Sequence, residues 1–217
     1  MHHYNRFNMA LIDNISDLRQ ALSRQNMQMT SNCDEEFYRI AESLFKNFAI
    51  KVGDIEYRFV ELEFYLNIKD ETKGITYKRD TKAGEWLIHY SGFDLSFESS
   101  IKENFYGGIL VRALTSSDYD TEKKNYINGP LRCLLQVFKG INALDSNNMT
   151  PQIIESKSIK AEEIKELVVC MRHGIDEKRS KSKYRYTIPL RMWPKDNSYK
   201  AYPADKIHQH YDSRQPM

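Results

Sequence analysis

Hydrophobic and polar residues alternate along residues 55–66, which read IEYRFVELEFYL. A period of two is typical of a β-strand, so Val60 and Leu62 fall on one face and Glu61 and Glu63 on the other. The same period recurs over 85–91, 93–99 and 107–114. Short polar segments separate these stretches, and this spacing favours antiparallel hairpins over parallel strands joined by helices.

Other segments place an apolar residue at every third or fourth position, which predicts amphipathic helices. These segments span 13–26, 34–49, 129–141 and 158–171. The helix over 129–141 begins with Gly129 and Pro130, a favourable start because proline fits the first turn of a helix. Its inward-facing residues are expected to be Leu131, Leu134, Leu135 and Phe138. A late strand is expected over 183–193.

The order of these elements predicts an α+β protein in which helices surround one curved antiparallel sheet. We expect a single domain over residues 34–193. Residues 1–33 are expected to form a helical appendage at its periphery. Residues 194–217 are polar and interrupted by proline, which indicates a C-terminal tail.

Composition and charge narrow the classes of function. The chain of 217 residues has a net charge of +2, which is too mild to diagnose nucleic-acid binding by itself. Its three cysteines form no CxxC pair, which favours a reducing compartment and argues against structural zinc. The sequence has no recognisable membrane span, signal peptide, P-loop or GxGxxG motif. We therefore expect a soluble cytoplasmic protein with no metal, no cofactor and no membrane contact.

The two glutamates of the first strand are the first candidate site. A solvated face of a half-buried strand explains them without any function. If that face is enclosed instead, two neighbouring carboxylates suit acid or base catalysis. Arg112 stands in the apolar stretch GGILVRAL, and it needs a carboxylate or an anionic ligand if it is buried. The expected partner in a structural ion pair is Glu63 or Glu98.

Two further features admit a binding role. His89 alternates onto the face of Leu87 and Ser91, where a single histidine is more often structural than functional. The basic run over 178–185 has serines and tyrosines beside its cations, and such side chains commonly contact a nucleic-acid backbone. Its cations are Lys178, Arg179, Lys181, Lys183 and Arg185. A solvated basic loop is the alternative interpretation of this run.

Several short segments share their order with a known family. Residues 60–66 read VELEFYL, residues 110–114 read LVRAL, and a Gly-Pro pair at 129–130 opens a helix. Farther along, Arg172, Gly174 and Ile175 are followed by Pro-Leu-Arg at 189–191. This succession, over residues 38–193, resembles the alkyladenine (3-methyladenine) DNA glycosylase family.

The resemblance implies one curved antiparallel sheet with surrounding helices, similar to the C-terminal domain of methionyl-tRNA formyltransferase. It also implies that a damaged purine nucleotide is flipped out of DNA and its N-glycosidic bond hydrolysed without a metal or cofactor. By position, Glu63 is the general base that activates water, and Tyr65 is a wall on which the base stacks. Arg112 lies beside the site, and His89 takes the place of a stacking tyrosine.

Three positions differ from the family. The histidine that follows its catalytic glutamate falls on Gly74 here, and the tyrosine that wedges into the duplex falls on Ser91 or Gly92. The family's asparagine on the next strand is replaced, with Glu98 as its counterpart. The general base is kept while the base-reading and wedging residues differ, which suits another substrate, an already exposed nucleotide, or lost activity.

The leading hypothesis is a divergent DNA N-glycosylase with Glu63 as its catalytic base and DNA as its partner. The residues expected around the substrate are Glu61, Tyr65, His89, Glu98 and Arg112. One alternative is a non-catalytic nucleic-acid-binding domain on the same fold. Another is a pocket for a small nucleoside, in which the two glutamates act as an inverting carboxylate pair. We expect Glu63, Tyr65, His89 and Arg112 to converge on one cavity.

Overall fold

A computed structural model describes residues 10–29, 33–68, 76–120, 126–140, 144, 150–170, 184–189 and 192. The helices are α1 (Ile15–Ala21), α2 (Arg24–Met29), α3 (Cys33–Asn47) and α4 (Pro130–Val137), and η1 (Ala161–Glu163) is a short 3-10 helix. The strands are β1 (Phe48–Val52), β2 (Ile55–Ile68), β3 (Trp86–His89), β4 (Gly92–Ser96), β5 (Phe105–Thr115), β6 (Tyr126–Asn128), β7 (Gln152–Glu155), β8 (Val168–Cys170) and β9 (Arg185–Thr187).

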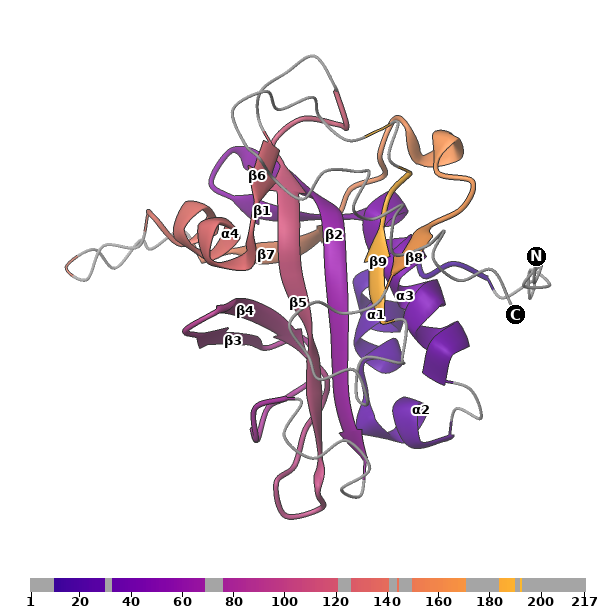
Figure 1. Ribbon diagram of the computed structural model, residues 1–217, viewed down its shortest axis with the longest axis vertical. Helices are drawn as coiled ribbons and strands as arrows, with labels where there is room; N and C mark the ends of the chain where they lie inside the picture. The colour runs from indigo at the N-terminus through magenta and orange to yellow at the C-terminus, as the bar shows by residue number, and fades with distance from the viewer. Residues whose placement is uncertain are drawn as a thin grey trace, which may run out of the picture.

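The described strands belong to one antiparallel sheet that curls into a half-barrel, with helices packed around it (Figure 1). Its main path runs β3-β4-β5-β2-β1-β7, while β6 pairs with β5, and β9 pairs with both β2 and β8. The long strands β2 and β5 stand side by side at its centre. The α+β class and the strands expected between residues 55 and 114 are therefore confirmed.

Strand β2 has different neighbours along its length. β5 pairs with nearly all of one edge. On the other edge, β1 pairs with residues 55–57 and β9 pairs with residues 61–63. The two glutamates of β2 therefore have a strand on each side, which places them inside the sheet and away from its edges.

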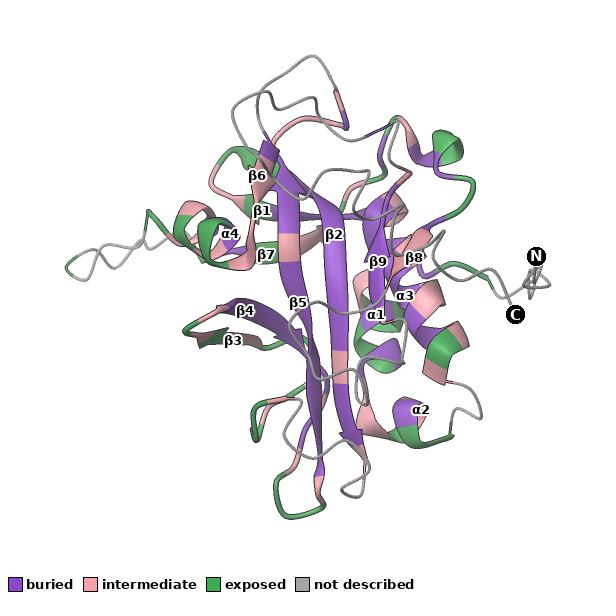
Figure 2. Ribbon diagram, in the orientation of Figure 1, coloured by how far each residue is buried: buried purple, intermediate pink, exposed green. Residues whose placement is uncertain are grey.

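Helix α3 packs its apolar stripe against one face of the sheet. Its residues Phe37, Ile40 and Leu44 are buried, and the ring centroids of Phe37 and Phe64 lie 4.8 Å apart. Phe64 belongs to the face of β2 that alternation assigns to the core, so Glu61 and Glu63 point to the opposite face. Figure 2 shows β2 and β5 buried along most of their length, which means that both faces of these strands are covered.

The N-terminal helices belong to the main core, in contrast to the peripheral position expected for residues 1–33. Leu18, Leu22 and Met27 are at most 4% exposed and join the same apolar cluster as Phe37. Their apolar stripe is visible in the sequence, but the surface that it packs on is distant in the chain. This segment is therefore part of the domain in the described residues.

The helix expected over 158–171 is not formed. Instead, η1 covers residues 161–163, and β8 pairs with β9 through residues 168–170. Val168, Val169 and Cys170 are compatible with either state locally, and the open edge of β9 selects the strand. The apolar period of the sequence predicted the apolar positions correctly, but it predicted the wrong type of secondary structure.

Helix α4 forms where expected, and Leu134 and Phe138 pack against the core as expected, but the other two residues expected to face inward do not. Its buried residues are Cys133 and Val137, whereas Leu131 and Leu135 are 48% and 63% exposed. Contact with β4 and β5 buries the side of the helix that carries Cys133 and Val137. None of the helices in the described ranges is long and apolar enough to cross a membrane.

Candidate functional site

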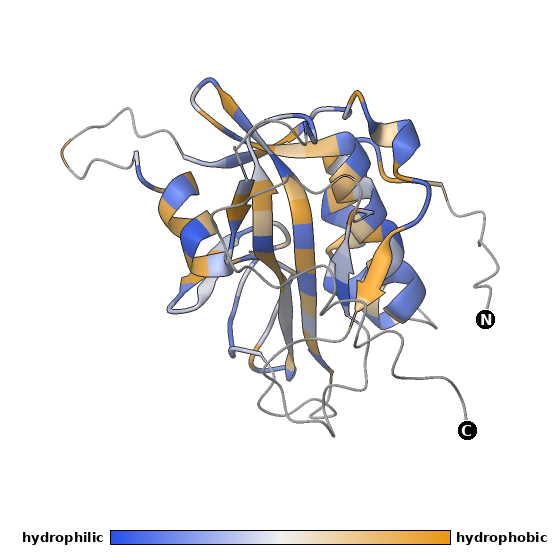
Figure 3. Cartoon of the chain, turned by 45° about the horizontal axis from the view of Figure 1, so that its top comes forward, coloured by the Kyte–Doolittle hydropathy of each residue, from blue (hydrophilic) through white to orange (hydrophobic). Residues whose placement is uncertain are grey.

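Glu61 and Glu63 are buried on the face of β2 that points away from α3. Their exposed fractions are 2% and 0%, so the interpretation as a solvated strand face is wrong. Polar positions of this kind appear as blue bands across the otherwise apolar central strands in Figure 3. Because an ionised carboxylate is costly to remove from water, both glutamates require cationic or hydrogen-bonding partners.

Arg112 is the partner that both carboxylates share. Its Nε donates to Oε1 of Glu61 at 2.9 Å, and its Nη1 donates to Oε2 of Glu63 at 2.6 Å. The register explains how one arginine reaches both. Ala113 pairs with Glu61, and Val111 pairs with the next residue of β2, so Arg112 is the extra residue of a β-bulge. Bulges re-aim side chains, and this one directs the guanidinium between the two glutamates.

Tyr65 and Arg185 complete the arrangement. The hydroxyl of Tyr65 donates to Oε1 of Glu63 at 2.6 Å, so both oxygens of this carboxylate accept a hydrogen bond. On the other edge of β2, Nε of Arg185 in β9 donates to Oε1 of Glu61. Two carboxylates thus meet two guanidiniums, and the formal charges balance. We refer to Glu61, Glu63, Tyr65, Arg112 and Arg185 as the Glu63 cluster.

Arg112 remains charged throughout the pH range in which proteins fold. Burial opposes its charge, but the carboxylates of Glu63 and Glu61 outweigh burial and raise the pKa of Arg112 above its usual value. The guanidinium is therefore a permanent cation that orients both carboxylates. It cannot exchange a proton, so proton acceptance within the Glu63 cluster falls to a carboxylate.

A second polar cluster surrounds His89. Its Nε2 lies 3.1 Å from Oδ1 of Asp94, and Oδ2 of Asp94 lies 2.8 Å from Nη1 of Arg79. The backbone N–H of Ser91 donates to Nδ1 of His89 at 3.3 Å, so Nε2 carries the ring proton and donates to Asp94. The ring of Tyr77 packs on the imidazole with centroids 4.7 Å apart. These contacts fix both the orientation and the tautomer of His89.

The two clusters share one face of the sheet. Leu110 of β5 pairs with Glu63 on one side and with Asp94 on the other, and residues paired across strands point to the same face. Asp94 is therefore two strands, or about 10 Å, from Glu63. Gly108 makes room for Arg79 on this face, because a Cβ at Gly108 would lie 2.6 Å from Nη1 of Arg79.

Three of the four residues expected to converge lie together in the structure. Tyr65 and Arg112 each donate a hydrogen bond to Glu63. His89 lies on the same face, but its partners are Asp94 and Ser91, and it makes no contact with the Glu63 cluster among the described residues. A cavity beside Glu63 stays a prediction.

Glu98 lies away from the Glu63 cluster. Its Oε2 accepts a hydrogen bond from the backbone N–H of Arg24 at 3.0 Å, and its own N–H donates to the carbonyl of Leu22 at 2.9 Å. The expected pairing with Arg112 is not observed, because β4 ends at Ser96 and the alternation of faces ends with it. Glu98 instead attaches the first two helices to the sheet.

The basic run is described only in part. Lys178, Arg179, Lys181 and Lys183 lie outside the described residues. Arg185 is 6% exposed and pairs with Glu61, so it faces the Glu63 cluster and does not lie on the exposed phosphate-binding edge expected for it. The pairing of β9 with β2 is what turns Arg185 inward.

Sequence reasoning missed Arg79 and Asp94, and it misplaced Arg185. Asp94 stands between Phe93 and Leu95 in a fully buried strand, which is the same signal that singled out Arg112. The same pattern marks Asp94 as a buried charge that needs a partner. Arg79 lies outside any periodic segment, so no local pattern marks it as buried.

No protein-family model matches the chain, and neither does any curated protein. The resemblance to DNA glycosylases therefore rests on the short segments alone. Two of these segments meet in the structure, since the backbone N–H of Gly129 donates to the carbonyl of Arg112 at 2.9 Å. The Gly-Pro start of α4 is thus attached to the strand that carries Arg112.

Proposed function

We propose that the protein is a divergent N-glycosylase that hydrolyses the bond between a damaged purine base and its sugar in DNA, with Glu63 as general base. The observation that carries the proposal is the burial of Glu63 between two hydrogen-bond donors, Tyr65 and Arg112. These residues come from the segments that resemble the alkyladenine DNA glycosylases. On this proposal the curled sheet corresponds to the formyltransferase C-terminal-domain type, and the protein works in the cytoplasm.

The proposed chemistry requires a carboxylate that is ionised and fixed in orientation. A carboxylate offers about four lone-pair positions. Tyr65 and Arg112 each occupy one position on Glu63, which leaves others for a water molecule. As that water attacks the sugar carbon, one of its protons passes to Glu63, the bond from this carbon to the base nitrogen breaks, and the base leaves with the bonding electron pair. Arg112 stabilises the ionised carboxylate beforehand and does not compete for the proton.

A buried hydroxyl on the same face supports a bound polar ligand. Ser96 is fully buried, and within the described part of the chain its Oγ has no hydrogen-bond partner. It pairs across the sheet with Gly108, whose other neighbour is Tyr65. An unsatisfied buried hydroxyl costs about 1–3 kcal/mol. A polar ligand group within hydrogen-bond distance of Ser96 would satisfy it.

Replacing Glu63 with glutamine tests the role of general base. Glutamine keeps the shape of the side chain but does not accept a proton from water, so base release should fall by about 10²–10⁴-fold. Binding of an oligonucleotide with an abasic analogue should stay within a few-fold of wild type. The measurement is release of alkylated or deaminated purines from single- and double-stranded oligonucleotides.

Glu56→Gln is the matched control, because Glu56 lies on the same strand but is exposed and outside the Glu63 cluster. This variant should release bases and bind DNA like wild type. Thermal unfolding of both variants separates lost chemistry from lost folding. If Glu63→Gln releases bases as fast as wild type, Glu63 is not the general base. If wild type releases no base from any substrate, the protein is not a glycosylase.

A non-catalytic nucleic-acid-binding domain is the second candidate. The same geometry favours it, because a glutamate with both oxygens bonded also makes a structural ion cluster. In that case wild type binds the oligonucleotides and releases no base. The inverting carboxylate pair has less support, since Arg112 bridges Glu61 and Glu63 where that mechanism needs room for water.

A further inference from the structure

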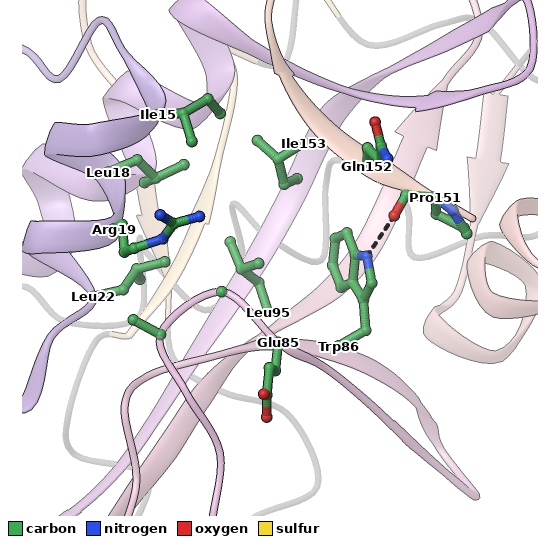
Figure 4. A pocket seen from close by; sticks show the side chains of 12 residues that line it. Ile15, Leu18, Arg19, Leu22, Glu85, Trp86, Leu95, Pro151, Gln152 and Ile153 are labelled. Atoms are coloured by element: carbon green, nitrogen blue, oxygen red, sulfur yellow. Dashed lines mark hydrogen bonds between the residues drawn. The ribbon is translucent and has the colours of Figure 1, made fainter. Parts of the chain in front are cut away.

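A cavity of about 360 Å³ lies between α1, the β3–β4 hairpin and β7 (Figure 4). Its lining is mainly apolar. Leu18, Leu22 and Leu95 are buried there, and Trp86 and Ile153 are half-buried beside them. A concave site of this volume, in which apolar walls are combined with polar side chains such as Arg19, Glu85 and Gln152, suits a small molecule that has both apolar and polar parts.

Helix α1 is held at both ends, so the cavity beneath it is part of the fold. At its start, the backbone N–H of Ile15 donates to Oε1 of Glu155 in β7 at 2.8 Å. Just beyond its end, the carbonyl of Leu22 accepts a hydrogen bond from the backbone N–H of Glu98. The helix therefore spans from β7 to the end of β4. It cannot move into the cavity without breaking one of these hydrogen bonds.

Trp86 gives the cavity a rigid aromatic wall. Its Nε1 donates to the carbonyl of Pro151 at 2.8 Å, and its ring packs against Phe93 with centroids 5.3 Å apart. These contacts hold the indole in place while part of it remains open to the cavity. A planar apolar group can stack there without first ordering the ring, which lowers the entropic cost of binding.

Arg19 adds a positive charge at the rim. Its side chain extends from α1 towards the cavity (Figure 4), and it has no ion pair with any residue of the described ranges. Glu85 also lines the rim, but it accepts a hydrogen bond from the backbone N–H of Lys82 and points away from Arg19. A free guanidinium beside apolar surface matches a carboxylate, which it binds through parallel hydrogen bonds.

We propose that this cavity binds a small organic carboxylate with a planar apolar body, which stacks on Trp86 and pairs with Arg19. The site is separate from the Glu63 cluster. Trp86 pairs with Leu95 and shares its face, whereas Asp94 and Glu63 point to the opposite face of the sheet. The binding proposal is therefore independent of the proposed glycosylase activity.

The test uses 2-naphthoate and its uncharged amide, 2-naphthamide, as matched probes. The chain has two tryptophans, so a full-length Trp193→Phe variant leaves Trp86 as the fluorescent reporter. 2-Naphthoate should quench this fluorescence saturably, and 2-naphthamide should bind at least about tenfold more weakly, because it lacks the charge-assisted hydrogen bonds. Arg19→Gln should weaken binding of the carboxylate alone and so remove the difference.

Two variants serve as controls for charge and for the cavity. Lys51→Gln removes a cation from an exposed position of β1 outside the cavity, and it should leave both affinities unchanged. Ala83→Phe fills the cavity from its own lining and should abolish binding of both probes, with folding checked by circular dichroism. Equal affinities for the two probes, equal losses in Arg19→Gln and Lys51→Gln, or no saturable quenching would each overturn the proposal.

Discussion

At the scale of single residues, Tyr119 shows how one buried hydroxyl joins distant parts of the chain. Its oxygen lies 2.7 Å from the carbonyl oxygen of Phe45 and 3.0 Å from that of Phe59, so its single proton is shared between acceptors in α3 and β2. Burial raises the pKa of this phenol above its usual value, and it therefore remains a neutral donor at neutral pH. No periodic pattern in the sequence points to this contact.

Tyr119→Phe should lower the free energy of unfolding by about 1–3 kcal/mol, because buried carbonyls lose their donor. Urea denaturation at pH 7 measures the change. Tyr106→Phe is the control, since Tyr106 is also buried but its hydroxyl has no hydrogen bond in the described part of the chain. It should cost no more than about 0.5 kcal/mol. An equal loss in both variants would show that ring packing, and not the hydroxyl, stabilises the site.

At the scale of elements, Glu98 attaches α1 and α2 to the end of β4. Its carboxylate binds the backbone N–H of Arg24, the first residue of α2, and its own N–H binds the carbonyl of Leu22 between the two helices. Both short helices depend on such tertiary contacts, because isolated helices of this length are not stable in water.

Glu98→Ala should destabilise the protein by about 1 kcal/mol, as the loss of a helix cap does. Amide hydrogen exchange should become faster in α1 and α2, while the proposed base release should be unaffected. Glu103→Ala is the control, because Glu103 also contacts Arg24, at 2.6 Å, but through an exposed ion pair worth roughly 0–1 kcal/mol. Reduced base release with unchanged exchange would instead assign Glu98 to a substrate site.

At the scale of the whole molecule, the polar face of the sheet is held by charge balance between strands. Arg112 comes from β5 and Arg185 from β9, and both pair with glutamates of β2 between them. Removal of one cation leaves carboxylates that the surrounding strands keep away from water. The stability of three strands therefore depends on the charge balance within the Glu63 cluster.

Arg112→Leu should destabilise the protein by about 3–5 kcal/mol at pH 7, because a buried carboxylate loses its partner. In this variant the neutral form of a buried carboxyl is favoured, so the folded state binds more protons than the unfolded chain. Its stability should consequently rise as the pH falls from about 7 to 5. Urea denaturation at a series of pH values measures both effects.

Arg112→Lys is the matched variant for this prediction. Lysine keeps the cation but cannot donate to both glutamates from a planar fork, so a smaller loss of stability and no gain at low pH are expected. If Arg112→Leu shows no pH dependence, water reaches the glutamates in the variant, and the cluster is less enclosed than their exposed fractions indicate.

The sequence by itself determined the features that depend on neighbouring residues. The period of two placed Glu61 and Glu63 opposite the core face of β2, and the apolar stripe of α3 identified its buried side. A charge in an apolar strand also indicated that Arg112 needs a partner. Each of these inferences uses only the geometry of one element, which the local chain specifies.

Only the tertiary structure decided how these elements meet. The bulge that directs Arg112 between the glutamates arises from the register of two strands, and the pairing of Arg185 with Glu61 joins residues far apart in the chain. The strand at 168–170 forms because β9 offers an edge. Register and edge pairing depend on contacts between segments that are far apart in the chain. The free energy of these contacts depends on both segments, so the pattern of one segment alone does not predict them.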